Sequence, residues 1–245
     1  MKVCAVIPVY NHGEAVGAVV KAVRSHGLPC VLVDDGSEPG CAAVLDGLAR
    51  EDSEHVAVVR LPQNEGKGGA MMAGLRSALE RGYSHALQID ADGQHNANDI
   101  PRFLALAKAR PDTLVCGTPV YDESVPKGRL YGRYATHIWV WINTLSFAIR
   151  DSMCGFRVYP LKPTVALIDS VKIGKRMDFD VEVLVRLFWR GMHILNQPTQ
   201  VRYPTDGISH FDVLWDNVRI SGMHARLFFG MLVRLPVLLW NKVAK

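Results

Sequence analysis

The sequence predicts an α/β fold with a mostly parallel sheet that carries helices on both faces. In residues 1–116, short apolar runs alternate with segments in which apolar residues recur at helical spacing. The connections between these segments are short, and this order of elements is typical of parallel sheets. Apolar residues make up 49% of the 245-residue chain, so a core can form and a mainly disordered chain is excluded.

Each expected strand is a short run rich in valine, isoleucine or leucine. The strands are expected at residues 2–9, 30–33, 56–61, 85–89 and 113–116. Each expected helix between them places apolar side chains three or four residues apart. The helices are expected at residues 14–25, 42–50, 69–80 and 98–109, with Asn98 as the cap of the last one.

The second half of the chain is less regular. Residues 127–150 contain four basic residues, five aromatic residues and no acid. Residues 178–183 alternate polar and apolar side chains, as a strand would, but the apolar run continues to Gly191 and favours a helix that ends at a glycine. Glu182 and Arg186 then form an i,i+4 pair, which we expect at the surface.

No internal repeat or low-complexity linker is present, so we expect one domain over residues 1–210 and a C-terminal extension over residues 211–245. The extension carries five basic residues against two acids, beside clusters of leucine, phenylalanine and tryptophan. Charges and Pro236 interrupt the uncharged apolar run of about 18 residues that a membrane span requires. We therefore expect amphipathic helices that lie on a membrane surface. The alternatives are a helix pair packed on the body and a contact in a homodimer.

Cysteine content, the N-terminus and charge predict the compartment. Five scattered cysteines form no CxxC pair and no disulfide framework, which favours a reducing compartment. The first residues run straight into a strand, so no secretory signal is expected. The net charge of +4 is mild and forms no basic stripe, so nucleic acid is not an expected partner. These features predict a cytoplasmic protein that associates peripherally with the inner face of the cell membrane.

Four consecutive strands deliver polar loops to one edge of the expected sheet. The loops are residues 10–11, 34–37, 64–68 and 90–95. In open parallel sheets, ligands bind beyond the carboxyl ends of the strands. This convergence predicts a ligand site at that edge.

Asp90 and Asp92 stand two residues apart at the end of the fourth expected strand. On an extended segment their carboxylates point the same way and can share a hard divalent cation with a diphosphate. Gln94 and His95 add oxygen and nitrogen donors. The alternative is a polar turn that caps the next helix.

Two further loops offer groups for a nucleotide. In the segment DDGS at residues 34–37, one carboxylate can accept from the N–H of a uracil or guanine base, or else form an Asx turn. Residues 64–69 lead a helix and can hold a phosphate or ribose through backbone N–H groups and Lys67. The P-loop spacing is absent, and no GxGxxG follows the first strand, which argues against a dinucleotide oxidoreductase. A glycine-rich loop is also absent there, which argues against a nucleotidyltransferase.

These motifs, in this order, resemble the family 2 glycosyltransferases, inverting enzymes of the GT-A fold. The matching segments are IPVYN at residues 7–11, VDDGS at 33–37, NEGKG at 64–68 and DADGQ at 90–94. The resemblance implies a Rossmann-like sheet, with the C-terminal amphipathic helices as an extension of it. Two later segments, DSMCGFR at 151–157 and FDVE at 179–182, are similar to the dolichol-phosphate-mannose-synthase-like branch. That branch moves a sugar onto a polyprenyl phosphate at a membrane.

The resemblance implies which residues bind the donor, a UDP- or GDP-linked sugar. The side chains that would line the nucleobase pocket are Pro8, Tyr10 and Asn11. Asp35 would read the base, and Lys67 and Asp90 would lie near the ribose and diphosphate.

The resemblance also implies a Mg²⁺ or Mn²⁺ site. Asp92 would be the main ligand, with Asp90 and Gln94 beside it. His210 resembles a late histidine that many GT-A enzymes bring to the metal, and the alternative is a surface loop histidine. A divalent ion stabilises the negative charge that develops on the leaving nucleoside diphosphate.

The acceptor is less closely defined. Asp180 aligns with the catalytic-base aspartate of the family. A base is needed when the acceptor is a hydroxyl, but not for a phosphate that is already ionised. Members that use lipid phosphates carry an arginine soon after the fifth strand, where this chain has Pro119. We expect Arg129, Arg133 and Arg157 to replace it, and both polyprenyl phosphate and a lipid hydroxyl stay open as acceptors.

The sequence thus predicts a metal-dependent, inverting glycosyltransferase that moves a sugar from a nucleotide-sugar to a lipid-linked acceptor at a membrane surface. The alternative is a non-catalytic protein of the same fold that binds nucleotide-sugars or acts as a membrane scaffold. Intact Asp92, Lys67 and Asp180 argue against a loss of catalysis.

Overall fold

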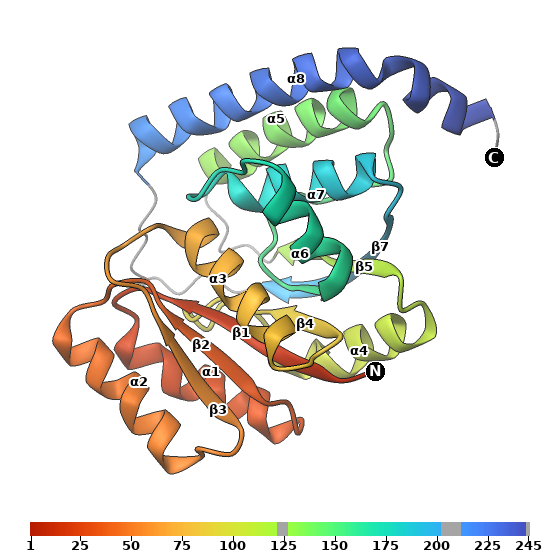
Figure 1. Cartoon of the computed structure of the whole chain (residues 1–245). Helices are drawn as coiled ribbons and strands as arrows, with labels where there is room; N and C mark the ends of the chain where they lie inside the picture. The colour runs from red at the N-terminus through yellow and green to blue at the C-terminus, as the bar shows by residue number, and fades with distance from the viewer. Residues whose placement is uncertain (122–126, 202–211, 244–245) are drawn as a thin grey trace.

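The computed structural model describes residues 1–121, 127–201 and 212–243. Its centre is a seven-stranded sheet with the strand order β3-β2-β1-β4-β6-β5-β7 (Figure 1). The strands are β1 (Val3–Val9), β2 (Cys30–Asp34), β3 (Val56–Arg60), β4 (His85–Gln88), β5 (Thr113–Tyr121), β6 (Arg157–Pro160) and β7 (His193–Val201).

The sheet is mostly parallel, as the order of the elements predicts. β1 pairs in parallel with β2 and β4, β2 with β3, and β5 with β7, whereas β6 is antiparallel to β4 and β5. β5 is longer than the sequence predicts, because its register with β7 continues from Thr113 opposite His193 to Tyr121 opposite Val201. The prediction ended at Cys116 because a glycine and a proline interrupt the apolar run beyond it.

Helices cover both faces of the sheet (Figure 1). The helices are α1 (Gly13–Ser25), α2 (Pro39–Glu51), α3 (Lys67–Glu80), α4 (Ile100–Ala109), α5 (Lys127–Thr144), α6 (Leu161–Ser170), α7 (Phe179–Trp189) and α8 (Val213–Val243). Side chains alternate between the faces along β1: Cys4 and Val6 pack in one core cluster with α3, whereas Ala5 and Ile7 pack in the other with α1. Two apolar cores therefore hold the central strands in place.

The helix ends confirm one prediction and correct another. α7 ends before Gly191, which has a φ of 84° that favours glycine. Asn96, and not Asn98, begins the helical segment after β4, because its side-chain oxygen accepts a hydrogen bond from the Asn98 N–H at 3.1 Å. A short 3₁₀ turn, η1 (Ala97–Asp99), then leads into α4.

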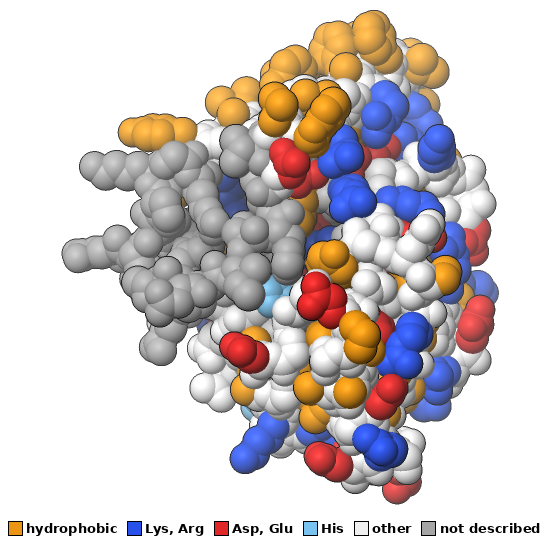
Figure 2. Space-filling model, turned by 90° about the vertical axis from the view of Figure 1, so that its left-hand side faces the viewer, with side chains coloured by type: hydrophobic (Ala, Val, Ile, Leu, Met, Phe, Trp, Pro, Cys, Tyr) orange, Lys and Arg blue, Asp and Glu red, His pale blue; other side chains and the backbone are white. Residues whose placement is uncertain are grey.

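α5 and α8 lie side by side above α7 and form an outer layer (Figure 1). Ile220, Met223 and Leu227 of α8 are buried in the same core cluster as the side chains of α7. The outward sides of both helices expose large apolar side chains: Tyr131, Tyr134, Ile138, Trp139 and Ile142 on α5, and Leu214, Trp215, Val218, Phe229, Leu232, Val233, Val237, Leu239 and Trp240 on α8. We call this surface the outer apolar face, and Figure 2 shows hydrophobic side chains gathered along the upper edge of the molecule.

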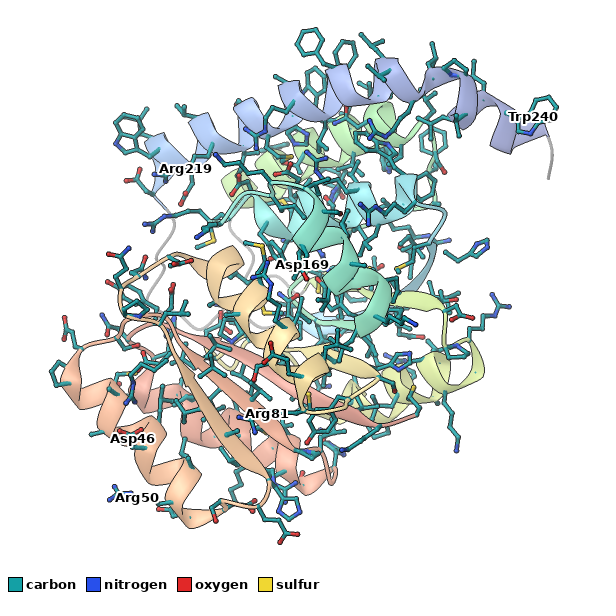
Figure 3. The ribbon with its side chains drawn as sticks, viewed as in Figure 1. Asp46, Arg50, Arg81, Asp169, Arg219 and Trp240 are labelled. Carbon is teal, nitrogen blue, oxygen red and sulfur yellow. The ribbon has the colours of Figure 1, made fainter. Side chains whose placement is uncertain are left out.

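In the described residues the C-terminal extension is one helix and not several, with Pro236 inside it. Within Leu214–Trp240, an 18-residue window has a mean hydropathy of 1.3, so by length and composition alone this segment is sufficient to cross a membrane. Arg219 and Trp240 stand near its two ends (Figure 3). One side of α8 packs on the body and the other side stays exposed. The helix therefore combines packing on the body with an exposed apolar side, which the sequence analysis treated as alternatives.

Glu182 corrects the prediction of a surface pair. Its side chain is fully buried, and Oε1 accepts a hydrogen bond from Arg186 Nη2 at 2.7 Å. Oε2 accepts from the Gly174 N–H at 2.9 Å and from Arg226 Nη2 of α8 at 3.3 Å. The periodicity of α7 alone could not reveal this burial, because α8 provides the cover and is more than 30 residues away in the chain. The bond from Arg226 to Glu182 therefore ties the outer layer to the body.

Candidate active site

A cluster of three charged side chains lies at the carboxyl edge of the central strands. Lys67 opens α3, Asp90 follows β4, and Asp180 stands in the first turn of α7. Lys67 Nζ lies 2.8 Å from Asp90 Oδ2 and 3.0 Å from Asp180 Oδ2. The fold thus brings together three predicted site residues that are distant in sequence.

All three side chains are poorly accessible to water, and Lys67 and Asp90 each favour the charged form of the other. Burial opposes the charge of Lys67, but the carboxylates of Asp180 and Asp90 outweigh it and raise the lysine pKa. Burial would raise the pKa of Asp90, but Lys67 and His95 outweigh it and lower that pKa. Lys67 and Asp90 are therefore an ion pair over the whole range of physiological pH.

The Asp180 carboxylate is engaged on both oxygens. Oδ2 contacts Lys67, and Oδ1 accepts a hydrogen bond from Gln88 Nε2 at 3.1 Å, with Arg157 Nη1 at 3.9 Å. Its side chain is only 7% exposed. Tyr159 in turn donates to Gln88 Oε1 at 2.9 Å, so a buried polar network holds the carboxylate. Gln88 and Tyr159 were not predicted, although a glutamine inside an apolar strand is a signal that could have identified the first of them.

The position of Arg157 contradicts the acceptor-binding role that the sequence predicted for it. The side chain is fully buried, and its donors reach the carbonyls of Cys154 at 2.8 Å, Ser152 at 2.7 Å and Asp180 at 2.7 Å. Because its donors bind groups inside the protein, the Arg157 guanidinium is not available to bind the sugar acceptor. It supports Asp180 and the loop before β6 instead.

A turn after β4 carries Asp90 and Asp92. Asp92 Oδ1 accepts the Gln94 N–H at 3.0 Å, and burial together with the charge of Asp90 raises the pKa of Asp92. Asp90 Oδ1 is buried and has no hydrogen-bond partner among the described residues. No group of three or more His, Cys, Asp or Glu side chains forms a metal cluster in residues 1–121, 127–201 and 212–243.

This donor set fits a hard divalent ion that a diphosphate shares. Carboxylate and amide oxygens are suitable ligands for Mg²⁺ or Mn²⁺, and such ions complete their shell with phosphate oxygens and water. The unpaired Asp90 Oδ1 and the carboxylate of Asp92 supply two such oxygens, and Gln94 stands beside them. His210, the fourth predicted ligand, lies outside the described residues.

The predicted nucleobase residues gather where β1 and β2 end. Pro8 pairs with Val33 in the β1–β2 register, and Tyr10 and Asn11 follow directly after β1. Asn11 has a φ of 56°, which asparagine tolerates better than most residues, and its Oδ1 accepts the Glu38 N–H at 2.8 Å. The loops after β1 and β2 are thereby joined.

Asp35 is buried and holds the loop that precedes α3. Its oxygens accept hydrogen bonds from the N–H groups of Glu65 at 2.7 Å and Gly66 at 2.9 Å, and from Asn64 Nδ2 at 3.1 Å. Burial raises the pKa of Asp35, while these N–H groups act in the opposite direction. The carboxylate therefore organises the loop that delivers Lys67, and its role in reading a base stays a prediction.

The remaining arginines lie on α5. Arg133 makes two hydrogen bonds to Asp151, from Nε to Oδ2 at 2.6 Å and from Nη2 to Oδ1 at 2.9 Å. The side chain of Arg129 lies outside the described residues. The acceptor role of Arg129 stays a prediction.

The fold is that of the GT-A glycosyltransferases, as predicted. It is similar to the crystal structure of glucosyl-3-phosphoglycerate synthase from Mycobacterium tuberculosis in complex with Mn²⁺ and uridine-diphosphate-glucose. The TM-score is 0.67, with 95% of this chain and 78% of that chain covered at 16% sequence identity.

The chain belongs to glycosyl transferase family 2, whose family model matches residues 4–165. It is 30% identical over 209 residues to the polyprenol monophosphomannose synthase of Mycolicibacterium smegmatis, covering 79% of this chain and 74% of the relative. It is also 30% identical over 209 residues to the undecaprenyl-phosphate mannosyltransferase of Micrococcus luteus, covering 81% and 82% of the two chains. These matches confirm the family and the branch that the motifs indicated.

Proposed function

We propose that this chain transfers a sugar from a nucleotide-sugar donor to a lipid phosphate at a membrane surface, with inversion at the anomeric carbon. The observation that carries the proposal is the site itself: Lys67, Asp90 and Asp180 converge beside the Asp92 turn at the carboxyl edge of the sheet. Support also comes from relatives whose names specify polyprenyl phosphate acceptors.

We assign the donor to the loops after β1, β2 and β4. Pro8, Tyr10 and Asn11 would line the pocket for the base of a UDP- or GDP-linked sugar, and Asp35 would read the base. Lys67 would meet the diphosphate, since an ammonium group that two carboxylates already hold in place needs little reorganisation to bind a third anion.

We assign a Mg²⁺ or Mn²⁺ ion to Asp92, Asp90 and Gln94, with His210 as a further ligand. When bound, this ion supplies positive charge to the leaving nucleoside diphosphate. The chain's own residues prepare for it: Lys67 keeps Asp90 ionised, and Asp92 is fixed by the Gln94 N–H.

The state of Asp180 favours a phosphate acceptor over a hydroxyl. A general base needs a lone pair aimed at the proton it removes. Both oxygens of Asp180 are already directed at Lys67 and Gln88, inside the protein. An acceptor phosphate is ionised near neutral pH and needs no base. We therefore interpret Asp180 as the group that fixes Lys67, rather than as a proton acceptor.

The outer apolar face is our candidate for the membrane contact. The catalytic residues lie in residues 1–210, and residues 211–245 with α5 would rest on the cytoplasmic side of the cell membrane. Aromatic side chains such as Tyr131, Trp215 and Trp240 suit the boundary between headgroups and acyl chains.

The test is a transfer assay with a panel of UDP- and GDP-sugars and Mn²⁺ or Mg²⁺. Vesicles carry either a polyprenyl phosphate or the polyprenol of the same chain length. We expect product from the phosphate and none from the alcohol. We also expect the turnover of Asp180→Asn to fall by less than about 10²-fold, which is the smallest loss typical of removing a general base. Transfer to the alcohol would refute the phosphate assignment, and a lack of transfer from every donor would refute the proposed function.

A further inference from the structure

α5 has two sides of different character. Tyr131, Tyr134 and Ile138 belong to the outer apolar face and are 72%, 56% and 53% exposed. Arg133 and His137 point to the opposite side, where their side chains are only 15% and 8% exposed. Their i,i+4 spacing places the two side chains one above the other on the helix.

Both inward side chains converge on one buried carboxylate, that of Asp151. Arg133 binds it through two nitrogens, and His137 Nε2 lies 3.2 Å from Oδ2. Burial would raise the pKa of Asp151, but the hydrogen bond from His137 and the charge of Arg133 outweigh it and lower that pKa. Oδ1 also accepts the N–H groups of Met153 at 2.9 Å and Cys154 at 2.7 Å. Asp151 thus holds the turn over residues 151–154, in the second half of the loop between α5 and β6.

The same loop is in contact with Asp90 and Asp180, the two carboxylates that hold Lys67. Gly155 lies against Asp90 so closely that a Cβ at this position would collide with the carboxylate. Arg157, at the end of the loop, donates to the backbone carbonyl of Asp180 at 2.7 Å. A movement of this loop would displace Asp90 and Asp180 together.

We propose that Arg133 and His137 are positioning residues, which act through Asp151 to fix the loop that seats Asp90 and Asp180. A helix that exposes an apolar side to its surroundings would then set the geometry of the active site. This inference rests on the proposed function, and it replaces the acceptor-binding role that the sequence suggested for Arg133. The reason is that the guanidinium already has a buried carboxylate as its bidentate partner.

The first test compares two reactions: transfer to polyprenyl phosphate, and hydrolysis of the nucleotide-sugar in the absence of an acceptor. In Arg133→Gln and Asp151→Asn we expect kcat to fall by about tenfold or more in both reactions, by similar factors, with the KM for the lipid changed less than about twofold. Arg133→Lys should recover only part of the loss, because an ammonium cannot reproduce the bidentate pair. Arg150→Gln is the matched control, since this exposed arginine is next to Asp151 and should behave as wild type.

The second test does not depend on activity. Hydrogen exchange of the Met153 and Cys154 amides, which donate to Asp151, should be at least about tenfold faster in Arg133→Gln than in wild type and unchanged in Arg150→Gln. A raised KM for the lipid with unchanged donor hydrolysis would overturn the inference and make Arg133 an acceptor ligand. Unchanged exchange would overturn it as well. If the wild type has no transferase activity, the proposed function fails. The exchange result still decides whether Arg133 fixes the loop through Asp151.

Discussion

The catalytic edge is the carboxyl edge of the sheet that carries Lys67, Asp90 and Asp180. This edge and the outer apolar face depart in opposite ways from the usual arrangement, in which apolar side chains are buried and charged side chains are exposed. At the catalytic edge, charged groups are buried: the side chain of Lys67 is 19% exposed and that of Asp180 is 7% exposed. On the outer face, large apolar groups are exposed: Val233 is 80% exposed and Trp240 is 72% exposed. Both arrangements cost free energy in a protein that only has to fold in water. The comparison indicates two functional surfaces, one for ionic chemistry and one for an apolar environment.

The two surfaces are also stabilised differently. Most of the buried charges are satisfied inside the protein, since Lys67 contacts Asp90 and Asp180, and Gln88 donates to Asp180. The outer face is held from behind by the buried side of α8, by the stacking of His224 on Trp139 and by the bond from Arg226 to Glu182. A change to the exposed side chains of the outer face should therefore leave the catalytic edge largely intact.

The largest expected effect is at the catalytic edge. Asp92→Asn should lower turnover by about 10³-fold, because it removes the main carboxylate for a divalent ion at the leaving diphosphate. Mn²⁺-dependent binding of the donor should be lost, while the affinity for anionic vesicles stays the same. Asp112→Asn, at an exposed aspartate, is the control. Calorimetry with and without Mn²⁺ checks the prediction, and unchanged Mn²⁺-dependent affinity would remove Asp92 from the metal site.

The next effect concerns the outer apolar face. The triple variant Phe229→Gln, Val233→Gln, Trp240→Gln removes three exposed apolar side chains from α8. Burial of such a side chain contributes about 1.5–3 kcal/mol, so even partial immersion of three should lower vesicle affinity by about 100-fold. Donor affinity should not change. The control variant Ser221→Gln, Ala225→Gln makes the same polar exchange at small exposed residues of α8. Wild-type binding by the triple variant in vesicle sedimentation would mean that this surface does not meet the membrane.

A smaller effect concerns the attachment of α8 to α5. His224 of α8 stacks on Trp139, and burial lowers its pKa to about 4. Unfolded, the same histidine takes up its proton at a pKa of about 6.5, so the unfolded state holds more protons between these two values. The free energy of unfolding should therefore fall as the pH falls, by about 2 kcal/mol between pH 7.5 and pH 5.

Denaturant unfolding of His224→Gln across the same pH range is the check on that prediction. This variant should lose about 2 kcal/mol less than wild type over the interval. His193→Gln, at an exposed histidine, should follow the wild-type curve. If His224→Gln follows it too, His224 is not held neutral by its burial between α5 and α8.

The sequence was sufficient for whatever depends on local pattern. Short runs of valine, isoleucine and leucine located the first four strands, and the polar clusters after them located the site edge. Interactions between distant elements could not be read in the same way. Lys67 and Asp180 are more than 100 residues apart, and nothing in either segment indicates that they form an ion pair.

Burial was the property that the sequence predicted worst. Arg157 and Glu182 carry charges and were expected at the acceptor site and at the surface, yet both are fully buried. Each is covered by partners from a remote element: Asp180 of α7 for Arg157, and Arg226 of α8 for Glu182. A charged residue stays inside only when such partners satisfy it, and helical periodicity does not contain that information.

The most direct test of the two-surface account is turnover of the α8 triple variant on two acceptors. One acceptor is a long polyprenyl phosphate embedded in vesicles, and the other is a short, water-soluble isoprenyl phosphate. At limiting vesicle concentration we expect turnover on the embedded lipid to fall by about 100-fold relative to wild type, while turnover on the soluble acceptor stays within about twofold. Equal losses on both acceptors, or no loss on vesicles, would contradict the separation of a catalytic edge from a membrane-binding face.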